Sequence, residues 1–451
     1  MFIALTLSLL SAPEGAPPRS LGFVEVLQEI RGHSKILEQA RAGVEIADGE
    51  VQKAWTSWQP NVQAIGSLTL NSVEATFDFN AILNGLAAGL NAEVQEILPG
   101  STFNLQFPQS EPTVIQPYVQ LAGVLSASQT LFNITVLRAP GVAKRARAAA
   151  LAQVDAAEDQ LFFQGATLFA TIAGLKGLEA AAERAAKVAE QRIVEAKVQV
   201  EAGTSTNLVV TRAETDKVSA ESQRIAVAAQ MRKLKAGLGL LVGAEGPIDV
   251  KGDSTEMPAL PAGQDYRSRT AIRAKQLSYE AADAAVGLSN LNWLPTLAAE
   301  GQMRWLNFGG FADNNFLATA TLNLVVPIYD QGVRYADTRI AEGRARAAQL
   351  ALEQQELEAI SFLEEARADL DSAEAEVTQA EAQLKLANES VAQAETLVRN
   401  GLATNLDLSD ADSRRYAADQ NAAQKKLARN LALLRLHYAS GGRLGELLEP
   451  R

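Results

Sequence analysis

The stretch GTSTNLVVTRAE (Gly203–Glu214) returns as GLATNLDLSDAD (Gly401–Asp412), 198 positions further along the chain. The two copies share Gly, Thr, Asn, Leu and Ala at equivalent positions. This period is far longer than the units of about 20 to 50 residues that build solenoids. It is close to half of the 451 residues, so we interpret the protein as a duplicated unit.

Two further pairs of landmarks recur in the same order. Trp58-Gln59-Pro60 and Trp293-Leu294-Pro295 each end a helical pattern, the first of which begins near Gly22. Proline stops a helix because it lacks an N–H donor and disfavours α geometry in the residue before it. Leu131-Phe132-Asn133 and Ile328-Tyr329-Asp330 each introduce a long alanine-rich helical pattern. We therefore expect helix, strand, loop, strand, long helix, glycine turn and returning helix in each half.

Four segments alternate apolar and polar residues with the period of two that a strand requires. The first of them places Val62, Ala64 and Leu68 on one face and Gln63 and Ser67 on the other. Each segment runs about 10 to 12 residues, close to the 9 to 11 that cross a bilayer when tilted. An apolar outer face with a polar inner face is typical of outer-membrane barrels, and the alternative is a soluble sandwich. Four strands cannot close a membrane-spanning barrel, which needs about 8, so such a barrel would be shared between chains.

The helical patterns predict a long coiled coil. Residues 136–200 and 333–399 would each form a helix of roughly 60 residues, about 90 Å long at 1.5 Å per residue. Leu161, Leu168, Ile172 and Leu175 recur at spacings of three, four and seven, which favours coiled-coil packing.

Composition and motifs argue against other classes. The net charge of −12 argues against a nucleic-acid partner, and no run of 18 apolar residues predicts a transmembrane helix. The two histidines, His33 and His437, lie far apart without triad or zinc spacing, so we expect no enzyme, no catalytic or metal site and no cofactor. The glycines at 237, 239 and 243 follow a leucine-rich helix rather than a strand, which predicts a helix end instead of a dinucleotide loop.

In this order and duplication, the features from about Leu21 to Gly441 resemble the TolC-like outer membrane efflux protein family. The resemblance implies a mainly α chain with a membrane β-barrel part, in which a homotrimer shares twelve strands and continues as a helical tunnel through the periplasm. It implies a gated, passive exit duct in the outer membrane for tripartite efflux or type I secretion. The partners would be a periplasmic adaptor (membrane fusion) protein, an inner-membrane pump reached through that adaptor, and outer-membrane lipid. The alternative from another class is a periplasmic coiled-coil adaptor or interaction protein without a pore.

By the same resemblance, the two inter-helix turns at 200–208 and 398–406 are the tips where the adaptor docks. Glycine suits such a turn because it tolerates positive φ. The tip residues are Val200, Gly203, Thr206, Asn207, Leu208, Val398, Gly401, Thr404, Asn405 and Leu406.

The resemblance also places a channel entrance beside the second turn. Asp407 and Asp410 match the positions of carboxylate rings at the periplasmic mouth, where three copies of each would favour cations. The alternative is that they are N-terminal acids favoured by the helix dipole. Arg212, at the position equivalent to Asp410, is expected to pair with a neighbouring carboxylate and help hold the entrance shut.

The halves differ between their strands. Pro60 and Phe132 lie 72 positions apart, whereas Pro295 and Tyr329 lie 34 apart. The additional residues fall on the side away from the helices and are therefore expected outside the cell. Two roles are open for them, a cap over the pore or a cover for its rim.

These observations predict a set of segment boundaries. They are a signal or flexible N-terminus at 1–20; a first repeat at 21–243 with strands at 60–73 and 117–131, an external loop at 74–116 and a helical hairpin at 136–243; a linker at 244–263; a second repeat at 264–443 with strands at 295–306 and 315–327 and a hairpin at 333–441; and a C-terminal tail at 444–451.

Overall fold

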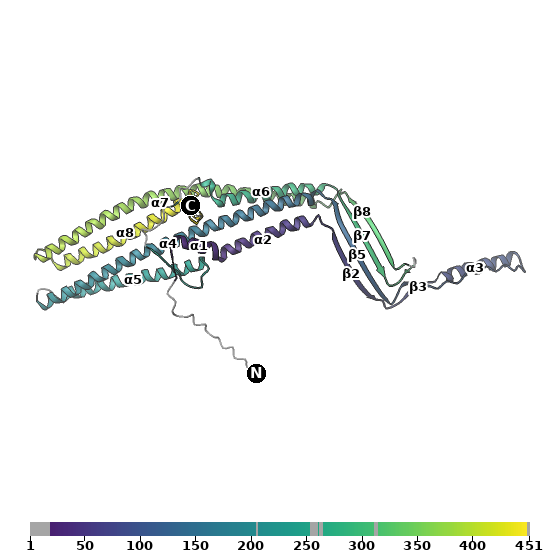
Figure 1. Ribbon diagram of the computed structural model, residues 1–451, viewed down its shortest axis with the longest axis horizontal. Coiled ribbons are helices and arrows are strands. Elements are labelled where there is room, and N and C mark those ends of the chain that lie inside the picture. Colours follow the sequence, from purple (N-terminus) through teal and green to yellow (C-terminus); the bar gives the residue numbers. More distant parts are fainter. Residues whose placement is uncertain (1–18, 204–205, 253–259, 261–264, 311–313, 449–451) are drawn as a thin grey trace, which may run out of the picture. The chain divides into compact units, whose positions relative to one another are not determined.

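The computed structural model describes residues 19–203, 206–252, 260, 265–310 and 314–448, and Figure 1 labels its elements. Contacts divide the chain into two compact units. The helical unit comprises 1–49, 144–283 and 343–451, and the sheet unit comprises 50–143 and 284–342. Each unit takes segments from both repeats. Most of the expected N-terminal signal, and of the later half of the expected linker, lies outside the described residues.

The chain is mainly helical, as predicted, and its helices include two of exceptional length. The helices are α1 (Phe23–His33), α2 (Lys35–Thr56), α3 (Phe79–Ile97), α4 (Ile134–Glu201), α5 (Asn207–Leu241), α6 (Thr270–Asn290), α7 (Val333–Arg399) and α8 (Asn405–Ala439). α4 and α7 contain 68 and 67 residues, which confirms the two long helices. α7 has the bounds expected from the sequence.

The helix expected over 22–58 is instead two helices. Ser34 lies between them with an extended ψ of 119°, and it is almost completely buried. The N–H of Ser34 still donates to the carbonyl of Ile30, so this carbonyl in the last turn of α1 has a hydrogen-bond partner before α2 begins.

One expectation about membrane helices needs refinement. α4 contains a stretch apolar enough by length and composition to cross a membrane, although the sequence lacks an unbroken apolar run. Because 61% of that stretch is buried within the chain, packing against neighbouring helices accounts for its composition.

The core of the helical unit forms where α1 and α4 meet. Phe23 packs edge-on against Phe169 with ring centroids 5.4 Å apart, and Phe162 is fully buried. A short parallel pair, β1 (Ser20–Leu21) and β6 (Asp249–Val250), adds Leu21 and Val250 to this core. Gly243 ends α5 at φ 71°, and a Cβ there would lie 2.3 Å from the carbonyl oxygen of His33. The helix-end interpretation of the glycines is therefore confirmed.

The sheet unit contains one antiparallel sheet in the order β2-β5-β7-β8. Its strands are β2 (Asn61–Leu70), β5 (Val119–Phe132), β7 (Thr296–Leu306) and β8 (Phe316–Val325). The register of the strands places residues of similar polarity opposite one another. One cross-strand row is polar and consists of Gln63, Ser126, Gln302 and Thr319, and the next row is apolar and consists of Ala64, Leu125, Met303 and Ala318. Because neighbouring rows point to opposite faces, the sheet has one polar and one largely apolar face.

The insertion expected as a loop at 74–116 contains regular structure. β3 (Ala75–Phe77) pairs with β4 (Thr113–Gln116), and α3 lies between them in sequence. Asp78 caps α3 by accepting a hydrogen bond from the N–H of Asn80 over 2.8 Å. The external loop is thus a strand pair that carries a helix.

Candidate functional site at the hairpin tips

The glycines of the two predicted turns have nearly the same backbone geometry. Gly203 and Gly401 have φ of 71° and 72°, the left-handed region that favours glycine. Their N–H groups donate to the carbonyls of Val200 and Val398, each over 3.0 Å. Residues 204 and 205 of the first turn lie outside the described residues. The two glycines were therefore predicted at the correct positions for a helix-ending turn.

The second turn starts its returning helix with a capping box. The N–H of Thr404 donates to the carboxylate of Asp407 over 2.8 Å, and the N–H of Asp407 donates to the hydroxyl of Thr404 over 3.3 Å. Hydrogen bonds from the hydroxyl and the N–H of Thr404 hold the pKa of Asp407 below its usual range. Asp407 is therefore an N-terminal acid of α8, as the alternative interpretation expected, and it remains exposed and charged. Thr206 occupies the equivalent cap of α5 without a side-chain cap bond.

The other two predicted entrance residues have different surroundings. Asp410 forms an exposed ion pair with Arg414, one turn further along α8, over 2.7 Å. Arg212 lies exposed on α5, and the described part of the chain offers it no ion pair within the protomer. Its pairing with a carboxylate stays a prediction.

A cavity of about 230 Å³ lies between α4, α5 and α8 near these turns. Its walls combine small alanines with charged side chains and one tyrosine. Arg212, Asn405 and Leu406, which the sequence had singled out separately, all line it. Thr206, Asn207 and Leu208 lie exposed where α5 begins.

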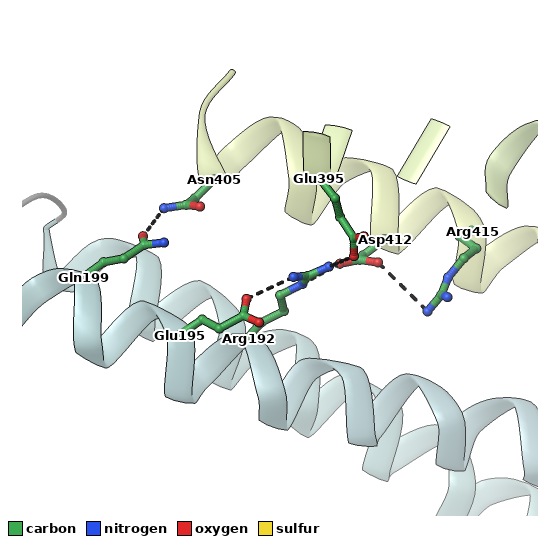
Figure 2. Close-up of polar contacts among 7 residues, drawn as sticks. All are labelled: Arg192, Glu195, Gln199, Glu395, Asn405, Asp412 and Arg415. Carbon is green, nitrogen blue, oxygen red and sulfur yellow. Dashed lines mark hydrogen bonds and ion pairs between the residues drawn. The ribbon is translucent and has the colours of Figure 1, made fainter. Parts of the chain in front are cut away.

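Arg192 joins the two hairpins beside this cavity, and Figure 2 shows its contacts. From α4 it donates to Glu395 of α7 over 2.8 Å and to Asp412 of α8 over 3.0 Å. It also donates to Glu195 of its own helix over 2.9 Å. Burial disfavours the charged guanidinium, but the hydrogen bonds to Glu395 and Glu195 and the charge of Asp412 outweigh it, so the pKa of Arg192 lies above its usual value.

Three further contacts join the hairpins around Arg192. Gln199 at the end of α4 accepts a hydrogen bond from Asn405 at the start of α8, which connects the two predicted tips directly (Figure 2). Ser409 donates to Asp216 of α5 over 2.9 Å, and Arg184 pairs with Asp419 over 2.8 Å.

Sequence reasoning missed Arg192, Glu395 and Asp412. Nothing local distinguishes them from the many charges that a long exposed helix carries. The repeat offers only a weak indication, because the position equivalent to Arg192 in the second half is Ser390.

Residues 266–442 match the family model described as outer membrane efflux protein. That match places an outer membrane efflux protein domain in the second repeat, and the resemblance predicted from the sequence is confirmed. Among curated protein sequences, none matches the chain.

Solved channel structures have the same fold over nearly the whole chain. CusC, described as forming a transmembrane channel, is 18% identical with a TM-score of 0.74 and 96% of each chain covered. The outer membrane protein VceC from Vibrio cholerae is 18% identical with a TM-score of 0.71, covering 93% of this chain and 96% of its own. The MtrE outer membrane channel of Neisseria gonorrhoeae, solved in its open state, is 19% identical with a TM-score of 0.68, covering 95% and 94%.

Proposed function

We propose that this chain forms a trimeric exit duct, with a shared twelve-stranded barrel in the outer membrane and its helices in the periplasm. Substrates would pass through it passively toward the outside. The proposal rests on the fold of the matched channels and on the chemistry of the sheet.

The observation that carries the proposal is an incomplete sheet. β2 and β8 are exposed at every position, and each has one edge that pairs with no other strand in the described part of the chain. An open sheet edge leaves backbone N–H and C=O groups available to pair with another strand. A large exposed apolar face is unfavourable in water and marks a surface that contacts a partner or a membrane. Further copies of the chain would pair with the edges, and lipid would cover the apolar face.

The helices fit a tunnel that meets a partner at its tips. We propose that these tips receive a periplasmic adaptor and, through it, an inner-membrane pump that supplies the energy. The exposed Leu208, Leu402 and Leu406 provide apolar contacts for such docking.

We further propose that Asp407 and Asp410 form the cation-favouring entrance. Both carboxylates are exposed at the start of α8. Three copies would concentrate negative charge around a narrow mouth. The ties from Arg192 to α7 and α8 would hold the second hairpin against the first and so keep this entrance narrow.

The test is single-channel conductance of the detergent-purified protein in a planar bilayer, with the mass of the complex measured in parallel. A trimer that conducts, and prefers cations over anions, is the expected result. A soluble monomer or dimer without conductance would overturn the duct and favour the periplasmic adaptor.

A further inference from the structure

The helix of the insertion, α3, exposes a row of large apolar side chains. Phe79, Ile82, Leu86, Leu90 and Ile97 are all at least 42% exposed. Their spacings of three, four and seven residues place them on one face of the helix. Glu93 is the single polar residue in this row.

A second face of α3 consists of small residues up to Ala92, carries Glu96 near the end of the helix, and is also exposed. Gly85, Ala88, Gly89 and Ala92 lie on it, and a Cβ built at Gly85 or Gly89 would meet nothing within 4 Å. At 100° per residue, this face adjoins the large apolar row. Small residues let a neighbouring helix approach closely, so the two faces are complementary to each other.

The remaining face of α3 is partly covered by its own segment. Asn80 bonds Ser110, and Asn91 bonds the backbone of Leu105 in both directions, over 3.1 and 2.8 Å. Ala87 is buried between these contacts. This face fixes how α3 is held on its loop and leaves the other two free.

Charge argues against a bilayer as the cover for the exposed faces. The stretch from Asn71 to Tyr118 contains Glu74, Asp78, Glu93, Glu96 and Glu111, and no lysine, arginine or histidine. Helices that lie in a membrane interface are typically rich in basic residues on their polar face. An acidic segment with complementary large and small faces is better suited to pack against its own copies.

We propose that α3 packs against α3 of the other two protomers, forming a three-helix cap over the outer mouth of the duct. The inference rests on the proposed trimer. In a three-fold ring each contact joins two different faces, so the large row of one helix meets the small face of the next. β3 and β4 tether α3 to the ends of β2 and β5, which a shared barrel brings round one axis.

Cysteine cross-linking tests this cap, since the chain contains no cysteine of its own. Ile82→Cys places a thiol on the large row, beside the small face. Asn84→Cys is the matched control, because residue 84 is also exposed and points about 200° away on the helix. Both purified complexes are treated with a short bifunctional maleimide, and their masses are measured before and after denaturation.

We expect covalent dimers from Ile82→Cys and none from Asn84→Cys, both in complexes that have trimer mass before denaturation. Trimer mass with no cross-link at Ile82 overturns the cap and leaves the duct intact, whereas absence of the trimer overturns both. Quenching of a fluorophore at Ile82→Cys by spin-labelled lipid in vesicles would identify lipid as the cover and also overturn the cap. As a second readout, Ile82→Asn with Leu86→Asn should raise conductance severalfold, and Asn84→Ala should leave it unchanged.

Discussion

Arg192 donates a hydrogen bond to Glu395 over 2.8 Å and so joins α4 of the first hairpin to α7 of the second. The same guanidinium reaches Asp412 of α8, whose Oδ1 atom is buried without a hydrogen-bond partner among the described residues. Arg192 therefore lies among three carboxylates, because it also bonds Glu195, and a second cation, Arg415, lies 4.0 Å from Asp412. This arrangement makes Arg192 the most highly connected of the side chains that hold the second hairpin against the first, beside the contacts of Gln199, Ser409 and Arg184.

Replacing Arg192 with Met should loosen the tips. The variant keeps an unbranched apolar side chain but removes the guanidinium, which leaves Glu395 without this partner and Asp412 with only Arg415, 4.0 Å away. We expect the free energy of unfolding to fall by about 1–3 kcal/mol and the conductance to rise severalfold. Thermal unfolding and single-channel recordings measure the two effects.

Arg184→Met is the control for this variant. Arg184 also joins α4 to α8, through Asp419, but its side chain is more than half exposed. Exposed ion pairs contribute about 0–1 kcal/mol, so little change is expected in either measurement. Equal effects of the two variants would show that Arg192 has no special role.

Cation preference should depend on Asp407 and Asp410. Neutralising both with Asn should reduce the cation-over-anion permeability ratio, which reversal potentials in a salt gradient measure. Thr404→Val separates the two roles of Asp407, because it removes the cap hydroxyl and leaves the carboxylate. If Thr404→Val lost as much selectivity as the double variant, capping rather than charge would be responsible.

The preference should also survive mild acid. Because Thr404 holds the pKa of Asp407 below its usual range, this carboxylate stays charged as pH falls through the ordinary aspartate value of about 3.9. The contribution of this capping hydrogen bond to stability depends on pH in the same direction. It is fully present above the ordinary aspartate pKa and is lost as pH falls through the folded-state pKa of Asp407. Thr404→Val should therefore shift the acid loss of selectivity to higher pH.

The two faces of the sheet should respond differently to charge. Leu322 and Thr321 are neighbours on β8, both exposed in the protomer, and they point to opposite faces. Leu322→Arg would place a charge in lipid at a cost of up to about 2–4 kcal/mol near the bilayer midplane, whereas Thr321→Arg would face the lumen. We expect only Leu322→Arg to reduce the yield of folded trimer, as judged on gels without heating. A reversed result would mean that the polar face contacts lipid.

Local patterns were sufficient to predict most of the fold. Alternation with a period of two located all four strands of the sheet, and Pro60 and Pro295 fixed where the preceding helices stop. The α3 helix was missed because Gly85 and Gly89 lower helix propensity, although the Asp78 cap was visible in the sequence. The break at Ser34 was missed because it depends on tertiary packing rather than on a local breaker.

The candidate site was predicted less completely than the fold. The glycines of both turns followed from the repeat, since a helix that ends in the left-handed conformation favours glycine at that position. Arg192 and its partners lie 203 and 220 positions apart in sequence, and only the packing of one hairpin on the other brings them together. The internal repeat does not predict this contact. It relates positions that are 198 residues apart, whereas Arg192 contacts residues at other positions of the second repeat.

Asp159 provides a test of the helical core that is independent of the channel. It is nearly buried on α4, accepts a hydrogen bond from Thr270 over 2.7 Å and lies 3.5 Å from Arg443. Burial raises the pKa of Asp159 despite both of these contacts. A carboxyl group with a raised folded-state pKa makes stability fall as pH rises from the unfolded pKa of about 3.9 through the folded pKa.

Asp159→Asn keeps an oxygen that accepts from Thr270 and removes the charge. The free energy of unfolding of this variant should therefore rise relative to that of the parent protein as pH rises across this range. The expected gain is about 1.4 kcal/mol per unit of difference between the folded and unfolded pKa of Asp159. Thermal unfolding at a series of pH values measures it, with the exposed Asp371→Asn as control. A difference that did not change with pH would mean that Asp159 titrates normally, and that water reaches this part of the core.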